Sequence, residues 1–349
     1  MRFLGSTRFF RGNLAVAALS AAAAALPISA QVNLTGAGAT FPAPVYQKWF
    51  SDYQSIGHVQ INYQPIGSGG GIRSVTEGTV DFGASDAALT DAQLQTFKDK
   101  HNGHPVLMFP TVLGAAVPSY NIPGVSQELN FTPQALAGIY LGKIKKWNDS
   151  QIASANPGVK LPDMDIIVVH RSEGSGTTYC WTDYLSKVSP EWKSKVGTNA
   201  SVDWPAGLGG KGNDGVAGLI KQQPGSIGYL ELIYAIHNHL AYGKVKNASG
   251  EFVKADLASV TAAAGALKSM PADFRVSITN ETGKGVYPIS TFTWLLVPSQ
   301  WSDASKKEAM VGFLKWAITT GQNSVESLDY AKLPASVVAK EQKQIAEIK

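Results

Sequence analysis

Cysteine is nearly absent from this sequence of 349 residues, because Cys180 is the only one. A single cysteine excludes a disulfide within the chain, and Cys180 lies too far from the N-terminus to be the acylated cysteine of a lipoprotein. After the first 30 residues no apolar run reaches the roughly 20 residues that span a membrane. The sequence also lacks GxxxxGK followed by Ser or Thr, and it has no carboxylate cluster that would suggest a two-metal site. ATP hydrolysis by a P-loop is therefore excluded.

The first 30 residues have the pattern of a secretory signal peptide. Arg2, Arg8 and Arg11 form a positive region, the 13 residues of Leu14–Leu26 are apolar and rich in alanine, and small residues lead to Ala30. Thirteen apolar residues are too few for a membrane anchor, which is the alternative interpretation. We therefore expect cleavage after Ala30 and an exported protein that is free in a bacterial periplasm, without a lipid anchor.

The balance of charge argues against nucleic acid as a partner. The chain has 30 basic and 26 acidic residues, and three of the basic ones lie in the expected signal peptide, which leaves a net charge of +1. A nucleic-acid-binding protein needs a clustered basic surface instead. The 319 residues after Ala30 exceed one ordinary hydrophobic core, so the length predicts two domains.

Helix-like and strand-like segments alternate along the chain. Short apolar or alternating runs predict strands at Val59–Tyr63, Val80–Ala84, Asp165–His170 and Thr291–Val297. Helices are expected at Val45–Gln54, Thr90–Lys100, Thr177–Val188 and Lys306–Thr320. Gly67–Gly71 is expected to form a turn, with a helix beginning after it at Ile72. This alternation is typical of an α/β fold with a largely parallel sheet.

Four turns share one composition, in which small or hydroxyl residues follow a strand or begin a helix. They are Gly38–Phe41, Gly67–Gly71, Ala84–Asp86 and Gly174–Thr177. A helix N-terminus carries unpaired N–H groups and about half a positive charge, and glycine lets the backbone approach a ligand closely. Each turn alone has an ordinary interpretation as a helix cap. Together with Arg171, which opens the stretch RSEGSGTTYCW, they indicate a site for an anion.

Six motifs, in chain order, resemble one known family. They are GAGATFPAPVYQKWF, INYQPIGSGGGIRSV, TVDFGASDAALTD, IYLGKIKKWND, RSEGSGTTY and GLGGKGNDGVAG. Over essentially all of the chain after the signal peptide, this pattern is similar to the periplasmic phosphate-binding protein of the phosphate-specific ABC importer. The resemblance implies a two-lobed, type II-like periplasmic binding protein fold with two crossing strands as the hinge, near Phe109–Val112 and Tyr287–Thr293. One lobe would comprise 31–110 and 290–349, and the other would comprise 111–289.

The resemblance also implies a set of phosphate ligands, carried over residue by residue. Phe41 would donate its backbone N–H, Ser68 its hydroxyl and N–H, and Arg171 would pair with phosphate oxygens. The complete implied set is Thr40, Phe41, Ser68, Asp86, Arg171, Ser175, Gly176 and Thr177. Glu173 departs from the family, in which an aspartate stands beside the arginine. Glutamate can still pair with Arg171 and restrain it.

Asp86 is the unexpected member of this set, because an acid repels an anion unless the anion brings a proton. Hydrogen phosphate has such a proton near neutral pH and sulfate does not. Asp86 can therefore accept a hydrogen bond from phosphate while it rejects sulfate. The alternative interpretation of Asp86 is an N-cap for the helix expected at Thr90–Lys100, although Asp91 is better placed for that role.

The function expected from these features is binding and delivery of phosphate, without chemistry on the ligand, without a cofactor and without a metal. The partners would be the permease subunits of an ABC importer with a separate ATPase subunit, and the protein would be a monomer. Two alternatives stay open: a phosphatase-like enzyme that uses the same anion site, and a binding protein for another tetrahedral oxyanion. Catalysis would need a nucleophile, a metal or a base, and the motifs hold no histidine or cysteine besides His170 and Cys180.

Several other patterns resemble functional motifs but lack the features that those functions require. Gly207–Gly212 matches GxGxxG, but a poor strand precedes it, so dinucleotide binding is not expected. The stretch Gly83–Ala87 lacks the last glycine of the hydrolase motif GxSxG. Trp181, Trp192 and Cys180 are expected in the core. Histidine pairs with metal-like spacing lack further ligands and are expected at the surface, at His101 and His104 and at His237 and His239.

Overall fold

The computed structural model describes residues 1, 2, 4 and 5 and residues 31–349. Most of the expected signal peptide, residues 3 and 6–30, therefore lies outside the described residues. Gln31–Lys349 form one compact unit. Among the described residues, no helix combines the length and the apolar character that crossing a membrane requires.

Nine strands of the described chain form one curled sheet in the order β2-β1-β3-β12-β4-β8-β6-β7, with β9 also paired to β4. A second sheet has the order β11-β10-β5. The strands are β1 Val32–Gly38, β2 Val59–Gln64, β3 Phe82–Ser85, β4 Val106–Asn121, β5 Asn130–Phe131, β6 Ile167–Arg171, β7 Leu208–Gly210, β8 Ser226–Glu231, β9 Ala241–Tyr242, β10 Lys244–Lys246, β11 Phe252–Val253 and β12 Ser290–Pro298.

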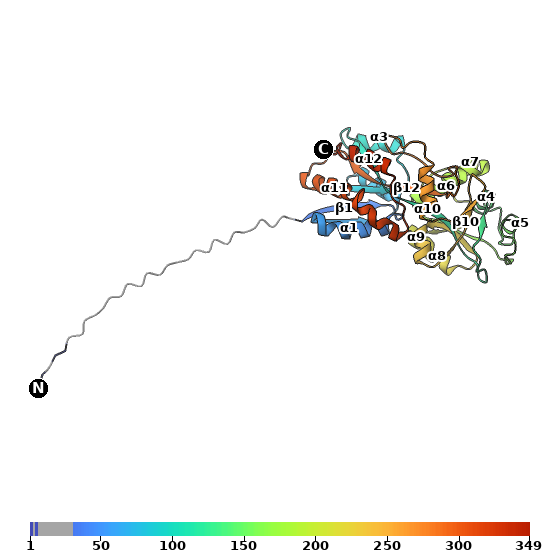
Figure 1. Ribbon diagram of the computed structural model, residues 1–349, viewed down its shortest axis with the longest axis horizontal. Helices are drawn as coiled ribbons and strands as arrows, with labels where there is room; N and C mark the ends of the chain where they lie inside the picture. Colours follow the sequence, from blue (N-terminus) through green and yellow to red (C-terminus); the bar gives the residue numbers. More distant parts are fainter. Residues whose placement is uncertain (3, 6–30) are drawn as a thin grey trace. The chain divides into compact units, whose positions relative to one another are not determined.

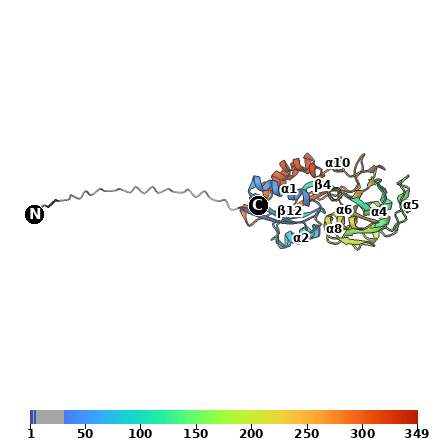
Figure 2. The ribbon, with the colours of Figure 1, turned by 90° about the horizontal axis from the view of Figure 1, so that it is seen from below.

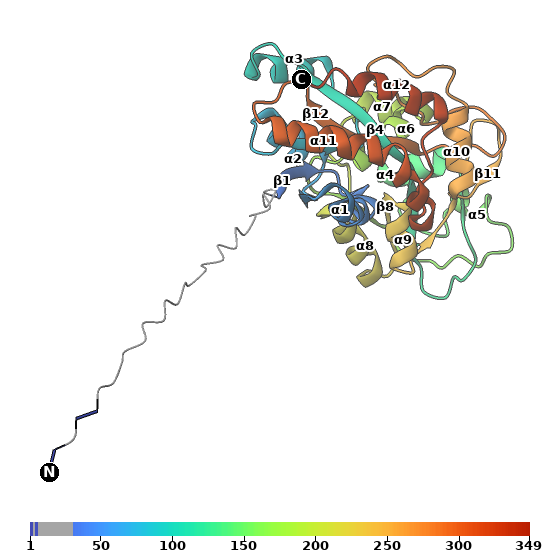
Figure 3. The ribbon, with the colours of Figure 1, turned by 60° about the vertical axis from the view of Figure 1, so that its left-hand side comes forward.

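The long strand β4 joins the two halves of the large sheet (Figure 3). Its residues Val106–Ala115 pair with β12, and its residues Ala116–Asn121 pair with β8. We call β1, β2, β3, β12 and the first part of β4 the first half-sheet. The second half-sheet consists of the rest of β4 with β8, β6 and β7. In Figure 1, α1, α11 and α12 accompany the first half-sheet, whereas α4, α6 and α8 lie on the side of the second.

The sheet is mixed rather than largely parallel. The pairs β1–β2, β1–β3, β6–β7 and β6–β8 are parallel. However, β12 runs antiparallel to β3 and β4, and β4 runs antiparallel to β8. The expectation of a largely parallel sheet holds for β1, β2 and β3 and for β6, β7 and β8, and it is wrong for the pairings that β4 and β12 make. Strand β4 runs through both halves, whereas β12 pairs only within the first half, and alternation of helix and strand does not report the direction of either.

The helices surround this sheet. In a second view, α1 and α2 lie toward one end of the molecule and α4, α6 and α8 lie toward the other (Figure 2). The helices are α1 Ala43–Gly57, α2 Ser68–Thr76, α3 Asp91–Lys100, α4 Pro133–Tyr140, α5 Ser150–Ala153, α6 Gly176–Val188, α7 Pro190–Lys195, α8 Gly212–Gln222, α9 Leu232–His237, α10 Leu257–Gly265, α11 Ala304–Ala317, η1 Thr320–Leu328 and α12 Ala335–Ile345.

Two local expectations are corrected by the helix starts. Helix α2 begins at Ser68, so Gly69–Gly71 are helical and only Gly67, with φ of 92°, makes the turn. Helix α3 is capped by Thr90, whose side chain accepts from the Gln93 backbone N–H while the Gln93 side chain accepts from that of Thr90. Thr90 therefore takes the cap position expected for Asp91, which is the first helical residue.

Aromatic side chains fill the core on both sides of the molecule. In the first half, Phe50 packs with Tyr46 and Phe313 beneath α1 and α11. In the second half, Trp181 stacks on Tyr229 at a ring separation of 5.1 Å. The expectation that Trp181, Trp192 and Cys180 belong to the core is confirmed, because all three are buried.

Candidate functional site

The four predicted turns lie at the carboxyl ends of strands in the two half-sheets. Thr40 follows β1, Ser68 begins α2 after β2, and Asp86 follows β3, all in the first half-sheet. Ser175 follows β6 in the second half-sheet and caps α6 with its hydroxyl, which accepts from the Thr178 N–H at 3.1 Å. The ends of strands where helices begin are where anions bind in open α/β sheets.

Direct contacts join the turns across the two half-sheets. The Gly69 N–H donates to the Gly174 carbonyl at 2.9 Å. The Ser68 hydroxyl oxygen accepts from the Gly176 N–H at 3.0 Å and from the Asp86 N–H at 3.2 Å. A Cβ placed on Gly176 would lie 2.6 Å from the Asp86 nitrogen, so this approach requires glycine. The structure thus brings all eight predicted site residues to buried positions, and the hydrogen bonds of their turns link them in one cluster.

Arg171 ends β6 and is held inside this cluster with 3% of its surface exposed. Its Nε donates to Glu173 Oε1 at 2.9 Å, and its Nη1 donates to the Thr177 hydroxyl at 3.2 Å. The backbone N–H of Arg171 donates to the Tyr229 hydroxyl at 3.1 Å. Glu173 Oε1 also accepts from the Gly212 N–H at 3.1 Å. The expected pairing of Glu173 with Arg171 is therefore confirmed.

Asp86 is 2% exposed and directly follows β3, beside Thr293 of β12. Burial raises the pKa of its carboxyl from the ordinary 3.8 to about 7, against the opposing effects of Thr293, Arg171, Ser68 and Thr177. The Thr293 hydroxyl donates to Asp86 Oδ1 at 2.9 Å. A carboxyl that gains or loses its proton near neutral pH can accept or share a proton with a ligand.

The turn of Thr40 and Phe41 is held by side chains from other elements. The Thr40 hydroxyl oxygen accepts from Asn213 Nδ2 at 2.9 Å, and the Thr40 carbonyl accepts from the Tyr234 hydroxyl at 2.6 Å. The Tyr330 hydroxyl donates to the Phe41 carbonyl at 2.5 Å. Sequence reasoning missed Asn213, Tyr229, Tyr234 and Thr293. Only Asn213 carried a signal, as the polar residue that follows the glycine run Gly207–Gly212.

This cluster is suited to holding an anion rather than to reacting with it. Its eight predicted residues combine one arginine, the N-termini of two helices and several hydroxyls with a single acid, Asp86, while a second acid, Glu173, pairs with Arg171. The Cys180 thiol is buried, and burial raises its pKa well above the ordinary value, so it is a poor nucleophile. The Nδ1–H of His170 donates to the Arg171 carbonyl at 3.0 Å, and its ring stacks on Trp204. Within the residues that the structure describes, no group of His, Cys, Asp or Glu could hold a metal ion.

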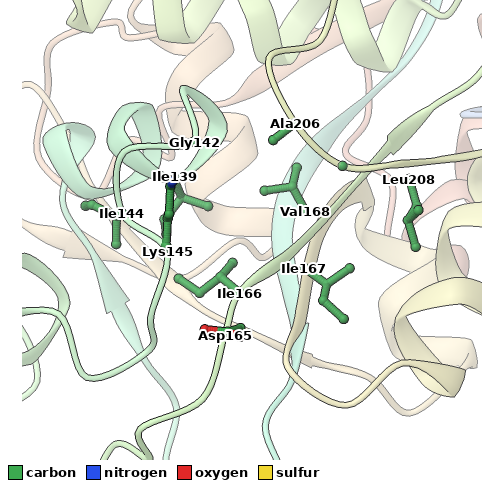
Figure 4. A pocket seen from close by; sticks show the side chains of 11 residues that line it. Ile139, Gly142, Ile144, Lys145, Asp165, Ile166, Ile167, Val168, Ala206 and Leu208 are labelled. Atoms are coloured by element: carbon green, nitrogen blue, oxygen red, sulfur yellow. The ribbon is translucent and has the colours of Figure 1, made fainter.

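Two further features do not belong to an anion site. Gly207–Gly212 contains the short strand β7 and the first residue of α8. The Gly212 N–H donates to Glu173 Oε1, so it is not free to bind a phosphate group. A surface hollow of about 620 Å³ is lined mainly by apolar side chains, including Ile139, Ile166 and Leu208 (Figure 4). None of the predicted site residues lines it.

Known proteins are similar to this chain over most of its length. A family model described as a PBP superfamily domain matches residues 21–320. The phosphate-binding protein PstS of Xylella fastidiosa strain Temecula1 is 45% identical over 309 residues, which are 88% of this chain and 83% of that protein. PstS of Haemophilus influenzae is 43% identical over 316 residues, covering 90% of this chain and 92% of that protein.

Solved structures share the fold at lower sequence identity. A periplasmic phosphate-binding protein called PfluDING, solved with bound phosphate, has a TM-score of 0.72 at 21% identity, covering 89% of this chain and 93% of that one. A phosphate-binding protein from Stenotrophomonas maltophilia has a TM-score of 0.69 at 19% identity with the same coverage. The α/β architecture is thus the two-lobed periplasmic binding protein fold, and β4 contributes to both half-sheets. On its identity to the curated relatives, the chain belongs to the PstS family of phosphate-binding proteins.

Proposed function

We propose that this protein binds inorganic phosphate as hydrogen phosphate and delivers it, chemically unchanged, to an ABC importer. The observation that carries the proposal is the placement of Asp86, a buried acid with a pKa of about 7, among N–H and O–H donors and one arginine. Such a site matches a ligand with several acceptor oxygens and one proton. Membership of the PstS family supports the same ligand.

Eight residues would contact the phosphate, each through a group suited to an oxygen. Arg171 would supply the positive charge, and Asp86 would accept the ligand's proton. The starts of α2 and α6 would add backbone N–H groups. The complete proposed set is Thr40, Phe41, Ser68, Asp86, Arg171, Ser175, Gly176 and Thr177.

The proposed delivery depends on two lobes that close on the ligand. We assign residues 31–110 and 290–349 to one lobe and 111–289 to the other. A boundary within β4 is supported by its change of partner between Ala115 and Ala116, and the second by the start of β12 at Ser290. Phosphate bound to both lobes favours the closed form, because it contributes more hydrogen bonds there.

The cellular setting follows from the same proposal. The protein would be exported to the periplasm through a signal peptide, 1–30, and would act there as a monomer without a lipid anchor. The closed form would dock on permease subunits, and a separate ATPase subunit would drive transport. A phosphatase-like activity is not favoured, because the PstS relatives are binding proteins and the cluster offers no activated nucleophile.

Isothermal titration tests this proposal with the protein Gln31–Lys349, stripped of bound phosphate by mild unfolding and dialysis. Near pH 7.5 we expect one phosphate per chain with a micromolar or lower Kd, which corresponds to about −8 kcal/mol or better. Sulfate should give no heat under the same conditions. Absence of phosphate binding would refute the proposal, and sulfate binding of equal strength would refute Asp86 as the proton acceptor.

Gly176→Ala is expected to weaken phosphate binding about tenfold or more. The new Cβ would lie 2.6 Å from Asp86, so α6 could not approach the turn after β3 without a shift. The same titration measures this effect. Gly218→Ala in α8 is the matched control, because a Cβ there meets no atom within 4 Å, and its Kd should equal that of the unmodified protein. An unchanged Kd for Gly176→Ala would contradict the close-contact argument.

A further inference from the structure

Asn213 makes a contact that the anion site itself does not explain. It lies in the first turn of α8 and is fully buried. Its side-chain Nδ2 donates to the Thr40 hydroxyl oxygen at 2.9 Å, and its backbone N–H donates to the same oxygen at 3.3 Å. Both donors therefore come from the second half-sheet side and converge on one hydroxyl of the β1–α1 turn.

These two donors determine whether the Thr40 hydroxyl can still accept a hydrogen bond from another group. A threonine hydroxyl has two acceptor lone pairs and one hydrogen. When both lone pairs accept from Asn213, the hydrogen has to be donated to a third group. Thr40 then faces the rest of the site only as a donor, which is the role that an anion requires.

The orientation of the Asn213 amide is fixed by a separate hydrogen bond. Its Oδ1 accepts from the Glu231 backbone N–H at 3.0 Å. Because a backbone N–H can only donate, Oδ1 has to face Glu231 and Nδ2 has to face Thr40. Glu231 ends β8 opposite Ala116, the residue at which β4 changes partner. The amide is thus anchored where the two half-sheets meet.

A second side chain from the same side holds the backbone of this turn. Tyr234 of α9 donates its hydroxyl to the Thr40 carbonyl at 2.6 Å. Tyr234 thereby fixes where Thr40 lies, whereas Asn213 fixes how its hydroxyl is oriented. Both bonds cross from the second half-sheet to the first, so both depend on the two halves being together.

We infer that Asn213 is a positioning residue that makes the Thr40 hydroxyl an obligate donor to the anion, and only when the lobes are closed. This inference rests on the proposed function. Separation of the lobes removes Asn213 from Thr40, and the freed hydroxyl can then rotate and bond to water. Closure therefore creates a correctly oriented donor, and opening abolishes it, which couples lobe opening to loss of affinity and to release.

A double-mutant cycle on the protein Gln31–Lys349 tests this inference by phosphate titration. Asn213→Ala is expected to raise the phosphate Kd by about 5- to 20-fold, because one of the two donors is lost. Thr40→Val, which keeps the shape and removes the hydroxyl, should raise it by at least as much. If Asn213 acts through that hydroxyl, the double variant should bind within twofold of Thr40→Val alone. In a Thr40→Ser background, which retains a hydroxyl, Asn213→Ala should again raise the phosphate Kd by about 5- to 20-fold.

Asn156→Ala is the matched control, because Asn156 is also a buried asparagine whose Nδ2 donates to two carbonyls, at 2.9 Å each. It should leave the Kd within twofold. Independent, multiplicative losses for Asn213→Ala and Thr40→Val would overturn the inference and leave the proposed function intact. Absence of phosphate binding by the unmodified protein would instead overturn the proposed function. Should Asn213→Ala fail to fold, Asn213→Ser, which keeps an acceptor for the Glu231 N–H, takes its place in the cycle.

Discussion

Replacing Arg171 by alanine is expected to weaken phosphate binding by about 100- to 1,000-fold. Arg171 is the buried cation of the site, and removal of one partner of a buried ion pair typically costs about 3–5 kcal/mol. Each 1.4 kcal/mol corresponds to a tenfold change in Kd. Glu173 would add to the loss, because its carboxylate would lose its ion pair and stand uncompensated beside the ligand. Isothermal titration of Arg171→Ala with phosphate measures the sum of both effects.

The two effects can be separated by a second variant. In Arg171→Ala with Glu173→Gln, the repulsive charge is also removed, so binding should recover in part while remaining weaker than that of the unmodified protein. Arg275→Ala is the control, because Arg275 pairs with Asp273 and Asp91 at a partly exposed position, where ion pairs contribute little. A Kd for Arg171→Ala within threefold of the unmodified protein would remove Arg171 from the site.

The local structure around Arg171 could be predicted from the sequence, because local chemistry determines it. The apolar run Asp165–His170 predicts a strand, and the observed β6 is Ile167–Arg171. Ser175 and Gly176 have the composition of a helix start, and α6 begins there with Ser175 as its cap. The same holds for the amphipathic pattern Lys306–Thr320, most of which is in α11.

The contacts between the half-sheets could not be predicted in the same way. Asn213 and Tyr234 are 173 and 194 residues away from Thr40, and no local pattern reports such a pairing. The sequence pattern places Thr293 in a predicted apolar strand and gives no sign that its hydroxyl donates to Asp86. The site therefore divides into groups that would contact the ligand, which family motifs identify, and groups that orient them, which only the fold reveals.

Replacing Asp86 by asparagine is expected to lower the ratio of the sulfate Kd to the phosphate Kd by at least tenfold. A carboxylate facing a sulfate oxygen places two acceptors together without a proton, and a site built around one hydrogen bond rejects an analogue that lacks it by about 10⁴ or more. The amide of asparagine can turn its N–H₂ toward sulfate, which replaces repulsion with a hydrogen bond. Phosphate affinity should fall only moderately, because the remaining donors stay in place. Competition titrations with the two anions near pH 7.5 measure the change.

The same substitution should change how stability depends on pH in the ligand-free protein. Burial raises the pKa of Asp86 from 3.8 to about 7, so between these pH values the folded state binds a proton that the unfolded state has released. The contribution of this carboxyl to stability is therefore full below about pH 4 and is lost as the pH rises toward 7. The free energy of unfolding of Asp86→Asn, minus that of the unmodified protein, should then increase across this window with a slope of up to about 1.4 kcal/mol per pH unit.

Urea denaturation of both proteins at several pH values gives this difference directly. Asp81→Asn is the matched control, because Asp81 is a mostly buried acid of the same half-sheet that pairs with Lys306 at 2.9 Å, away from the site. It should leave the preference for phosphate unchanged. The sulfate experiment tests Asp86 as a carboxylate that accepts the ligand's proton, and the stability experiment tests the raised pKa of the same carboxyl in the ligand-free protein. If Asp86→Asn rejects sulfate as firmly as the unmodified protein while the pH-dependent difference appears, then Asp86 titrates as argued but another group discriminates between the anions.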